Sequence, residues 1–242
     1  MNYHVSWPED ARRFLDKVVN AHGGHASWDK VHSITFSLKK FSGALLFAKG
    51  LNRTFQPAKK IWVYPKQRKV TFEYQDHVNS FENGKVTFSK EGKVIPDGRM
   101  IFRRSTFEQW SPAHATYFFG YAWANYISYP FILSEFELLS HELNSDNPFL
   151  EIKFPEGFHT HCRIQKFYFN KDHLLSRHDY HAELAGPLVY GAHSCSGYVE
   201  HQGVKIATIR EVRPKMGSIV LPIYGIYGEI QLVSSLPTRV MG

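Results

Sequence analysis

The chain has 242 residues, which is long enough for a sizeable core. Of these residues 43% are hydrophobic and 21% charged, a composition that excludes a disordered protein. Its formal net charge of +7 favours acidic ligands or anionic surfaces by electrostatic attraction, without bearing on the fold. The two cysteines, Cys162 and Cys195, lack a metal-binding spacing, so no zinc or disulfide framework is expected, although a single bridge between them is left open.

The apolar stretches are short. No run of about 18 apolar residues occurs, and the first residues show no charged segment followed by an apolar one. We therefore expect a cytoplasmic protein without stable membrane insertion.

The first predicted element is an N-terminal helix over about residues 7–22. Ser6 and Glu9 have the spacing of a capping box, and an apolar stripe from Phe14 to Val19 follows. Gly23 and the glycine after it end the helix.

From residue 31 to about 104 the apolar pattern changes to a period of two, which is typical of strands. The strands are predicted over 31–41, 44–55, 61–64, 69–74 and 86–89. Residues 82–85 have the sequence of a hairpin turn, and further turns are expected at 91–93 and 96–98. Together these segments predict an antiparallel meander.

An aromatic helix over about 112–128 interrupts the strands. Ser111 can cap it, Pro112 fits its first turn, and Pro130 prevents its continuation. Aromatic residues lie on more than one of its faces, so we expect a lid helix that covers a cavity, although simple core packing would give the same pattern. The residues expected to contact a ligand are Tyr117, Phe118, Tyr121, Trp123 and Tyr126, with Phe167 from a later strand.

Strands resume after this helix, over 136–143, 149–154, 159–169, 174–184, 189–199, 204–212 and 218–233. No internal repeat or linker-like segment divides the chain, so residues 1–242 are expected to form one domain. The predicted fold class is α+β: a large curved antiparallel sheet, or half-barrel, of ten or more strands, with the N-terminal helix and the inserted aromatic helix on its concave face.

Three stretches carry a family resemblance: "AHGGHASWDKVHSI", "YFFGYAWANYISYPF" and "YFNKDHLLSRHDY". With the order of the elements, they resemble the LolA-like half-barrel superfamily of bacterial lipoprotein carriers, within an uncharacterised bacterial group. The resemblance implies the fold and no catalytic residues. The carriers are exported, whereas this sequence shows no signal peptide. An enzyme of pigment biosynthesis is also known on a similar half-barrel, so the fold is compatible with cofactor-free chemistry.

The stretch 157–184 is rich in histidine and is predicted to form a hairpin turning at residues 170–173. If Asn170 pairs with Leu174, Gln165 lies opposite Asp179, and alternation places one polar set on a single face. A one-residue slip would pair different groups and place Gln165 with His178. This set is His161, Arg163, Gln165, Arg177, Asp179 and His181. The face either is exposed to solvent or lines the cavity, where its histidines could serve as acid and base, with Asp179 orienting them and an arginine holding an enolate or carboxylate.

Other kinds of site are less favoured. His159 and His161 could share a metal ion with Glu183, but Arg163 and Arg177 on the same face would repel it, so we expect no metal. His193 and Cys195 share a strand face without a third group to orient them. The basic residue pairs are dispersed along separate strands, which does not favour nucleic-acid binding.

Two functions lead at the level of sequence, ahead of a weaker third, a peripheral membrane protein that uses its basic rim. The first is a cofactor-independent enzyme that performs acid-base chemistry, such as isomerisation, cyclisation or condensation, on an apolar or aromatic small molecule held in the half-barrel. The second is a non-catalytic carrier of a hydrophobic ligand or lipid, in which the same polar groups anchor a headgroup. Neither requires a cofactor, and the sequence leaves the oligomeric state open.

Overall fold

The computed structural model describes residues 7–51, 58–91, 93–95 and 102–233. Its helices are α1 (Glu9–Ala21), α2 (Gly24–Asp29), α3 (Ala44–Ala48) and α5 (Pro112–Ser128), with 3₁₀ turns η1 (Pro65–Gln67) and η2 (Leu133–Glu135). The strands before α5 are β1 (Ile34–Ser42), β2 (Lys60–Tyr64), β3 (Lys69–Glu73), β4 (His77–Glu82), β5 (Lys85–Lys90) and β6 (Lys93–Ile95). The strands after it are β7 (Glu137–Glu142), β8 (Phe149–Lys153), β9 (Ile164–Phe169), β10 (Leu175–His181), β11 (Tyr190–His201), β12 (Val204–Met216), β13 (Ile219–Val220) and β14 (Ile226–Leu232).

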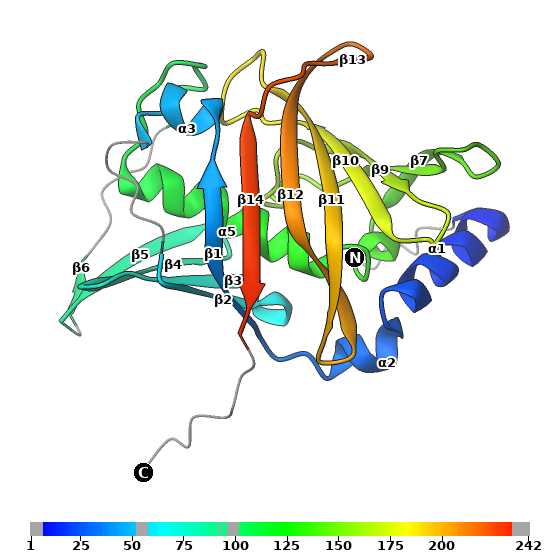
Figure 1. Ribbon diagram of the computed structural model, residues 1–242, viewed down its shortest axis with the longest axis horizontal. Helices are drawn as coiled ribbons and strands as arrows, with labels where there is room; N and C mark the ends of the chain where they lie inside the picture. Colours follow the sequence, from blue (N-terminus) through cyan, green and yellow to red (C-terminus); the bar gives the residue numbers. More distant parts are fainter. Residues whose placement is uncertain (1–6, 52–57, 92, 96–101, 234–242) are drawn as a thin grey trace.

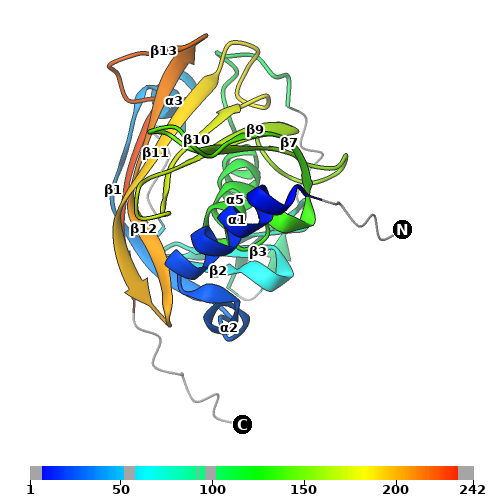
Figure 2. The same ribbon diagram turned by 90° about the vertical axis from the view of Figure 1, so that its right-hand side faces the viewer.

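Within the described residues all strands belong to one antiparallel sheet, in the order β6-β5-β4-β3-β2-β1-β14-β12-β11-β10-β9-β8-β7, with β13 paired to β12. The first and last long strands, β1 and β14, are neighbours at the centre, so the halves of the chain before and after α5 are joined edge to edge. The sheet curves strongly, and α1 and α5 lie inside the curve (Figures 1 and 2). The predicted half-barrel with helices on its concave face is confirmed.

Helix α1 occupies the predicted position within about two residues at each end. It begins at Glu9, directly after Pro8, and Ser6 of the predicted capping box lies outside the described residues. Its buried face, which includes Leu15 and Val18, packs on the sheet, and the ring of Phe14 meets that of Phe169 edge-on at 5.5 Å. Burial of this apolar stripe explains why the helix lies against the sheet.

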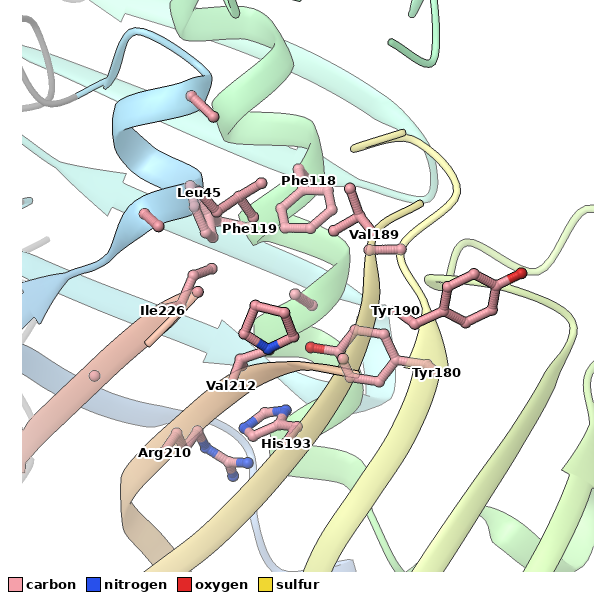
Figure 3. Close-up of a pocket in the computed structure, with 18 of the residues that line it drawn as sticks. Leu45, Phe118, Phe119, Tyr180, Val189, Tyr190, His193, Arg210, Val212 and Ile226 are labelled. Carbon is pink, nitrogen blue, oxygen red and sulfur yellow. The ribbon is translucent and has the colours of Figure 1, made fainter. Parts of the chain in front are cut away.

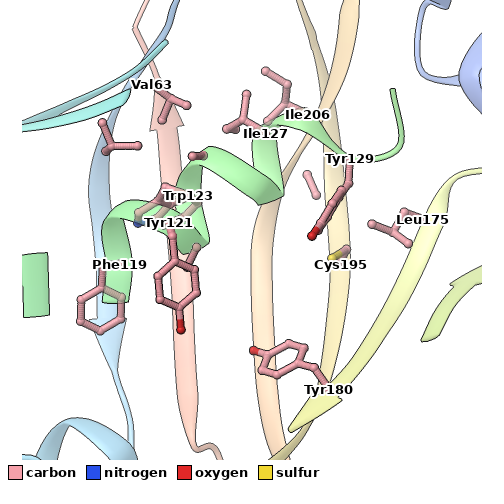
Figure 4. Packing of buried hydrophobic residues seen from close by; sticks show 14 of the residues in the cluster. Val63, Phe119, Tyr121, Trp123, Ile127, Tyr129, Leu175, Tyr180, Cys195 and Ile206 are labelled. Atoms are coloured by element: carbon pink, nitrogen blue, oxygen red, sulfur yellow. The ribbon is translucent and has the colours of Figure 1, made fainter. Parts of the chain in front are cut away.

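Helix α5 has the predicted bounds, and Ser111 caps it in a capping box with His114. Side chains on all its faces are buried, because the sheet wraps around it (Figure 2). Figure 4 shows Trp123 and Ile127 of α5 in one apolar cluster with Val63 of β2 and Ile206 of β12. None of the helices in the described part of the chain is long and apolar enough to cross a membrane.

Several segments differ from the sequence prediction. Helix α2 and strand β4 were not predicted, and the strand predicted over 218–233 is divided into β13 and β14. Residues 44–48 of the strand predicted over 44–55 form α3, because Gly43 takes a positive φ of 145° and the good helix formers Ala and Leu follow it. Gly43 also lies so close to β14 that an added Cβ would meet the Gly225 carbonyl at 2.2 Å. Strand β9 begins at Ile164, so the preceding residues 159–163, predicted as strand, form a bent segment. The turns predicted at 91–93 and 96–98 fall wholly or partly outside the described residues.

Candidate ligand pocket and buried polar network

The histidine-rich hairpin has the predicted turn but not the predicted register. Asn170 N–H donates to the Leu174 carbonyl, and His173 takes the left-handed conformation at a φ of 59°. Leu175 pairs with Phe169 as expected, but a bulge at Ser176 shifts the register, so that Asp179 lies opposite Lys166 and not Gln165. The prediction that the polar set shares one face of the hairpin is therefore wrong.

The shift moves part of the set to the outer face of the sheet. Asp179 accepts a two-pronged bond from the guanidinium of Arg177 and a 2.6 Å bond from Lys215 Nζ. His181 donates to the Gly186 carbonyl at 3.0 Å and stacks on Tyr190, and Arg163 is exposed. These groups are engaged in structural contacts away from the inner residues His161 and Gln165.

The inner face instead carries a network of histidine and tyrosine under α5. His161 is 2% exposed, and its two ring nitrogens bond the hydroxyls of Tyr121 at 3.0 Å and Tyr126 at 2.7 Å. The Tyr126 hydroxyl also lies 3.2 Å from that of Tyr180. A neutral imidazole has one donor and one acceptor, so one tyrosine donates to His161 and the other accepts from it.

Gln165 and His178 form a second hydrogen-bonded group beside this network, where the His178 ring lies 4.8 Å from that of Tyr180. The Gln165 amide oxygen accepts from His178 Nε2, and its amide nitrogen donates to Thr160 Oγ1 and to the Cys162 carbonyl, both at 2.6 Å. The ring of His178 stacks on Phe167 at 4.4 Å. Both polar atoms of the Gln165 side chain are thus hydrogen-bonded inside the protein.

Burial keeps the inner histidines neutral. It lowers the pKa of His161 to about 3, and it lowers the pKa of His178 and His193 well below their ordinary value. The positive charge of Arg210 acts in the same direction on His178 and His193. Burial also raises the pKa of the Tyr126 hydroxyl well above its ordinary value. At neutral pH these histidines and this tyrosine are therefore uncharged.

An apolar pocket of about 250 Å³ opens beside this network, between α3, α5 and strands β10, β11, β12 and β14. Leu45, Phe118, Phe119 and Val189 surround its upper end in Figure 3, and His193 and Arg210 lie at its lower end. The lining also includes Phe41, Ala48, Ala122, Trp123, Tyr126, Tyr180, Val212 and Ile226. The pocket thus has apolar walls and a polar inner end, which is the usual character of a small-molecule site.

The end of the pocket at His193 and Arg210 contains polar atoms without a partner among the described residues. His193 is 1% exposed, and neither of its ring nitrogens has a hydrogen-bond partner there. Arg210 is 7% exposed, and its Nε likewise has none. Unsatisfied groups at this depth are costly in free energy, which makes this end of the pocket a candidate for a polar contact with a ligand.

The predicted ligand residues divide into two groups. Phe118, Trp123 and Tyr126 line the pocket. Tyr117 bonds His159 at 2.7 Å, Tyr121 bonds His161, and Phe167 packs on His178, so these three support the walls from behind.

Sequence reasoning missed Arg210 altogether and considered His193 only as a partner for Cys195. A signal was present: alternation along β12 places Arg210 on the same face as the buried Val204 and Ile206. A charged residue at an inward position of an apolar strand marks a functional candidate.

The metal alternative finds little geometric support. His159 and His161 turn to different tyrosines of α5, Tyr117 and Tyr121. Over the part of the chain that the structure describes, no three His, Cys, Asp or Glu side chains are grouped to hold a metal ion.

Two solved structures are similar to this chain. A LolA superfamily protein from Nitrosomonas europaea is 11% identical at a TM-score of 0.47, over 93% of this chain and 91% of that chain. A DUF1329 family protein from Desulfovibrio piger is 16% identical at a TM-score of 0.44, over 92% of this chain and 90% of that one. Searches with the sequence find no matching protein-family model and no matching curated protein.

Proposed function

We propose that the protein binds an apolar small molecule in the pocket between α3 and α5 and acts as a binding or carrier protein. The observation that carries this proposal is the pocket of about 250 Å³ with its walls of Phe118, Phe119 and Trp123. This volume lies just below the range of about 300–1,000 Å³ that is typical of drug-sized ligand sites, so it suits a small ligand, and burial of that ligand against aromatic walls supplies the binding free energy.

Binding is favoured over catalysis by the positions of the polar residues. The six residues expected to perform acid-base chemistry do not form one group. His161 and Gln165 lie on the inner face of the sheet, whereas Asp179 lies on its outer face and Arg163 is exposed to solvent. Asp179, expected to orient a histidine, is held by Arg177 and Lys215 on the outer face. His161 stays neutral with both nitrogens bonded to tyrosines. The enzymatic role of this set remains a prediction.

The proposal is tested with the neutral, environment-sensitive dye Nile red. Ala48 is half-buried and lines the pocket, so Ala48→Trp should fill its mouth and weaken dye binding about tenfold or more. Phe47→Trp is the matched control, since Phe47 is the preceding residue of α3, is 71% exposed and does not line the pocket. Equal dye binding by the wild type and Ala48→Trp, with both folded, would show that the pocket is not the binding site.

A cytoplasmic location, as the sequence predicts, also remains a prediction. Fractionation of cells that express the chain at its native level is the direct test. Recovery outside the cytoplasm would leave the binding proposal intact and change only where the ligand is acquired.

A further inference from the structure

Arg210 is a buried cation without a counterion in the part of the chain that the structure describes. Its contacts among the described residues are the sulfur of Cys195 at 3.3 Å, the carbonyl of Tyr126 at 3.3 Å, and the rings of Tyr126 and Trp123. None of these is a carboxylate. Withdrawal of a guanidinium from water costs several kcal/mol unless an anion compensates it, and arginine cannot escape this cost by losing its proton.

His193 provides a second polar group beside this charge. It lies on β11 and Arg210 on the adjacent β12, where Arg210 pairs with Cys195, two residues beyond His193. Both side chains line the same end of the pocket, and both have nitrogens without a partner among the described residues (Figure 3). The neutral His193 ring keeps one N–H that can donate to an acceptor on the ligand.

The remaining lining is mostly apolar, so the pocket has one charged end and an otherwise apolar wall. An occupant that matches it has a single negative charge at one end and an apolar body at the other. A carboxylate fits best, because a planar two-oxygen anion can accept from the guanidinium and from the His193 N–H together, and one negative charge balances the one cation. A phosphate monoester would bring more negative charge than Arg210 balances.

We propose that the pocket recognises a monocarboxylic amphiphile, with its carboxylate at Arg210 and His193 and its apolar tail between Phe118, Phe119 and Leu45. This proposal rests on the proposed function and specifies the chemical class of its ligand. Arg210 is the specificity-determining group, and the aromatic walls supply affinity that does not depend on the headgroup.

The test compares headgroups on one short tail by displacement of Nile red from the wild type. Octanoate should displace the dye at least about tenfold more strongly than 1-octanol, and octyltrimethylammonium should be the weakest, because only the carboxylate can form a hydrogen-bonded charge pair with Arg210. Equal displacement by octanoate and octanol would overturn the carboxylate proposal. Tighter binding of octyl phosphate than of octanoate would overturn the choice of a monoanion.

A matched pair of variants assigns the effect to one side chain. Arg210→Gln should lower octanoate affinity about tenfold or more and leave octanol affinity unchanged. Arg213→Gln on the same strand should change neither, because Arg213 lies outside the lining, where it contacts Glu211 and Tyr224. Unchanged octanoate affinity in Arg210→Gln would refute the role of Arg210.

The two proposals fail in different ways. Failure of Nile red to bind, or insensitivity of the dye to Ala48→Trp, contradicts the proposed function itself. If dye binding responds to Ala48→Trp but octanoate and 1-octanol displace the dye equally, only the carboxylate proposal is contradicted. If Arg210→Gln does not fold, the headgroup series on the wild type still decides the question.

Discussion

Because several histidines are buried, we expect the free energy of unfolding to fall in mild acid. Burial lowers the pKa of His22 from 6.5 to about 4 and that of His161 from 6.5 to about 3. As the pH falls, the unfolded chain therefore binds these protons before the folded protein does. The contribution of these neutral histidines to the free energy of unfolding is fully present above pH 6.5. It is lost progressively as the pH falls from 6.5 to about 4 for His22 and to about 3 for His161.

The magnitude follows from the distance between the pH and the unfolded pKa. At pH 5, which lies 1.5 units below 6.5 and above both folded values, each histidine costs about 2 kcal/mol, since one unit corresponds to about 1.4 kcal/mol. Together they lower the free energy of unfolding by about 4 kcal/mol between pH 8 and pH 5. His178 and His193 act in the same direction.

Urea unfolding measured from pH 8 to pH 5 tests this reasoning. His161→Gln removes one titrating group, so its free energy of unfolding should fall by about 2 kcal/mol less than that of the wild type over this range. The same substitution at the exposed His32 controls for a general effect of histidine loss. If the wild type and His161→Gln lose the same stability, His161 is readily protonated in the folded protein, and the neutral network beneath α5 is refuted.

Three further predictions concern the outer face, the helix and the domain. Asp179→Asn should lower the free energy of unfolding by about 1–3 kcal/mol through loss of its bonds to Arg177 and Lys215, and leave Nile red affinity unchanged; lost binding with unchanged stability would contradict the structural role. Gly120→Ala should cost about 1–3 kcal/mol in thermal denaturation, because its Cβ would meet that of Phe81 at 2.3 Å, and a stabilised variant would contradict this close packing. We expect one domain, and so a single calorimetric unfolding transition; two separated transitions would refute it.

Local sequence signals predicted much of the fold. Ser111, Pro112 and Pro130 determine where α5 begins and ends, because capping and proline geometry act within a few residues. The turn at Asn170 formed as predicted for the same reason. Strand alternation predicted the sheet, since one side of each strand must be buried.

Only the tertiary structure decided which groups meet. One extra residue, Ser176, reverses the faces of the following strand, so Asp179 points outward and His178 inward. No local signal announces such a bulge, because it depends on packing against the neighbouring strands and α5. Arg210 and His193 lie 17 positions apart in sequence and become neighbours only when β11 pairs with β12. The sequence by itself determined a curved sheet around an aromatic helix, whereas strand register and long-range packing determined where its polar pocket lies.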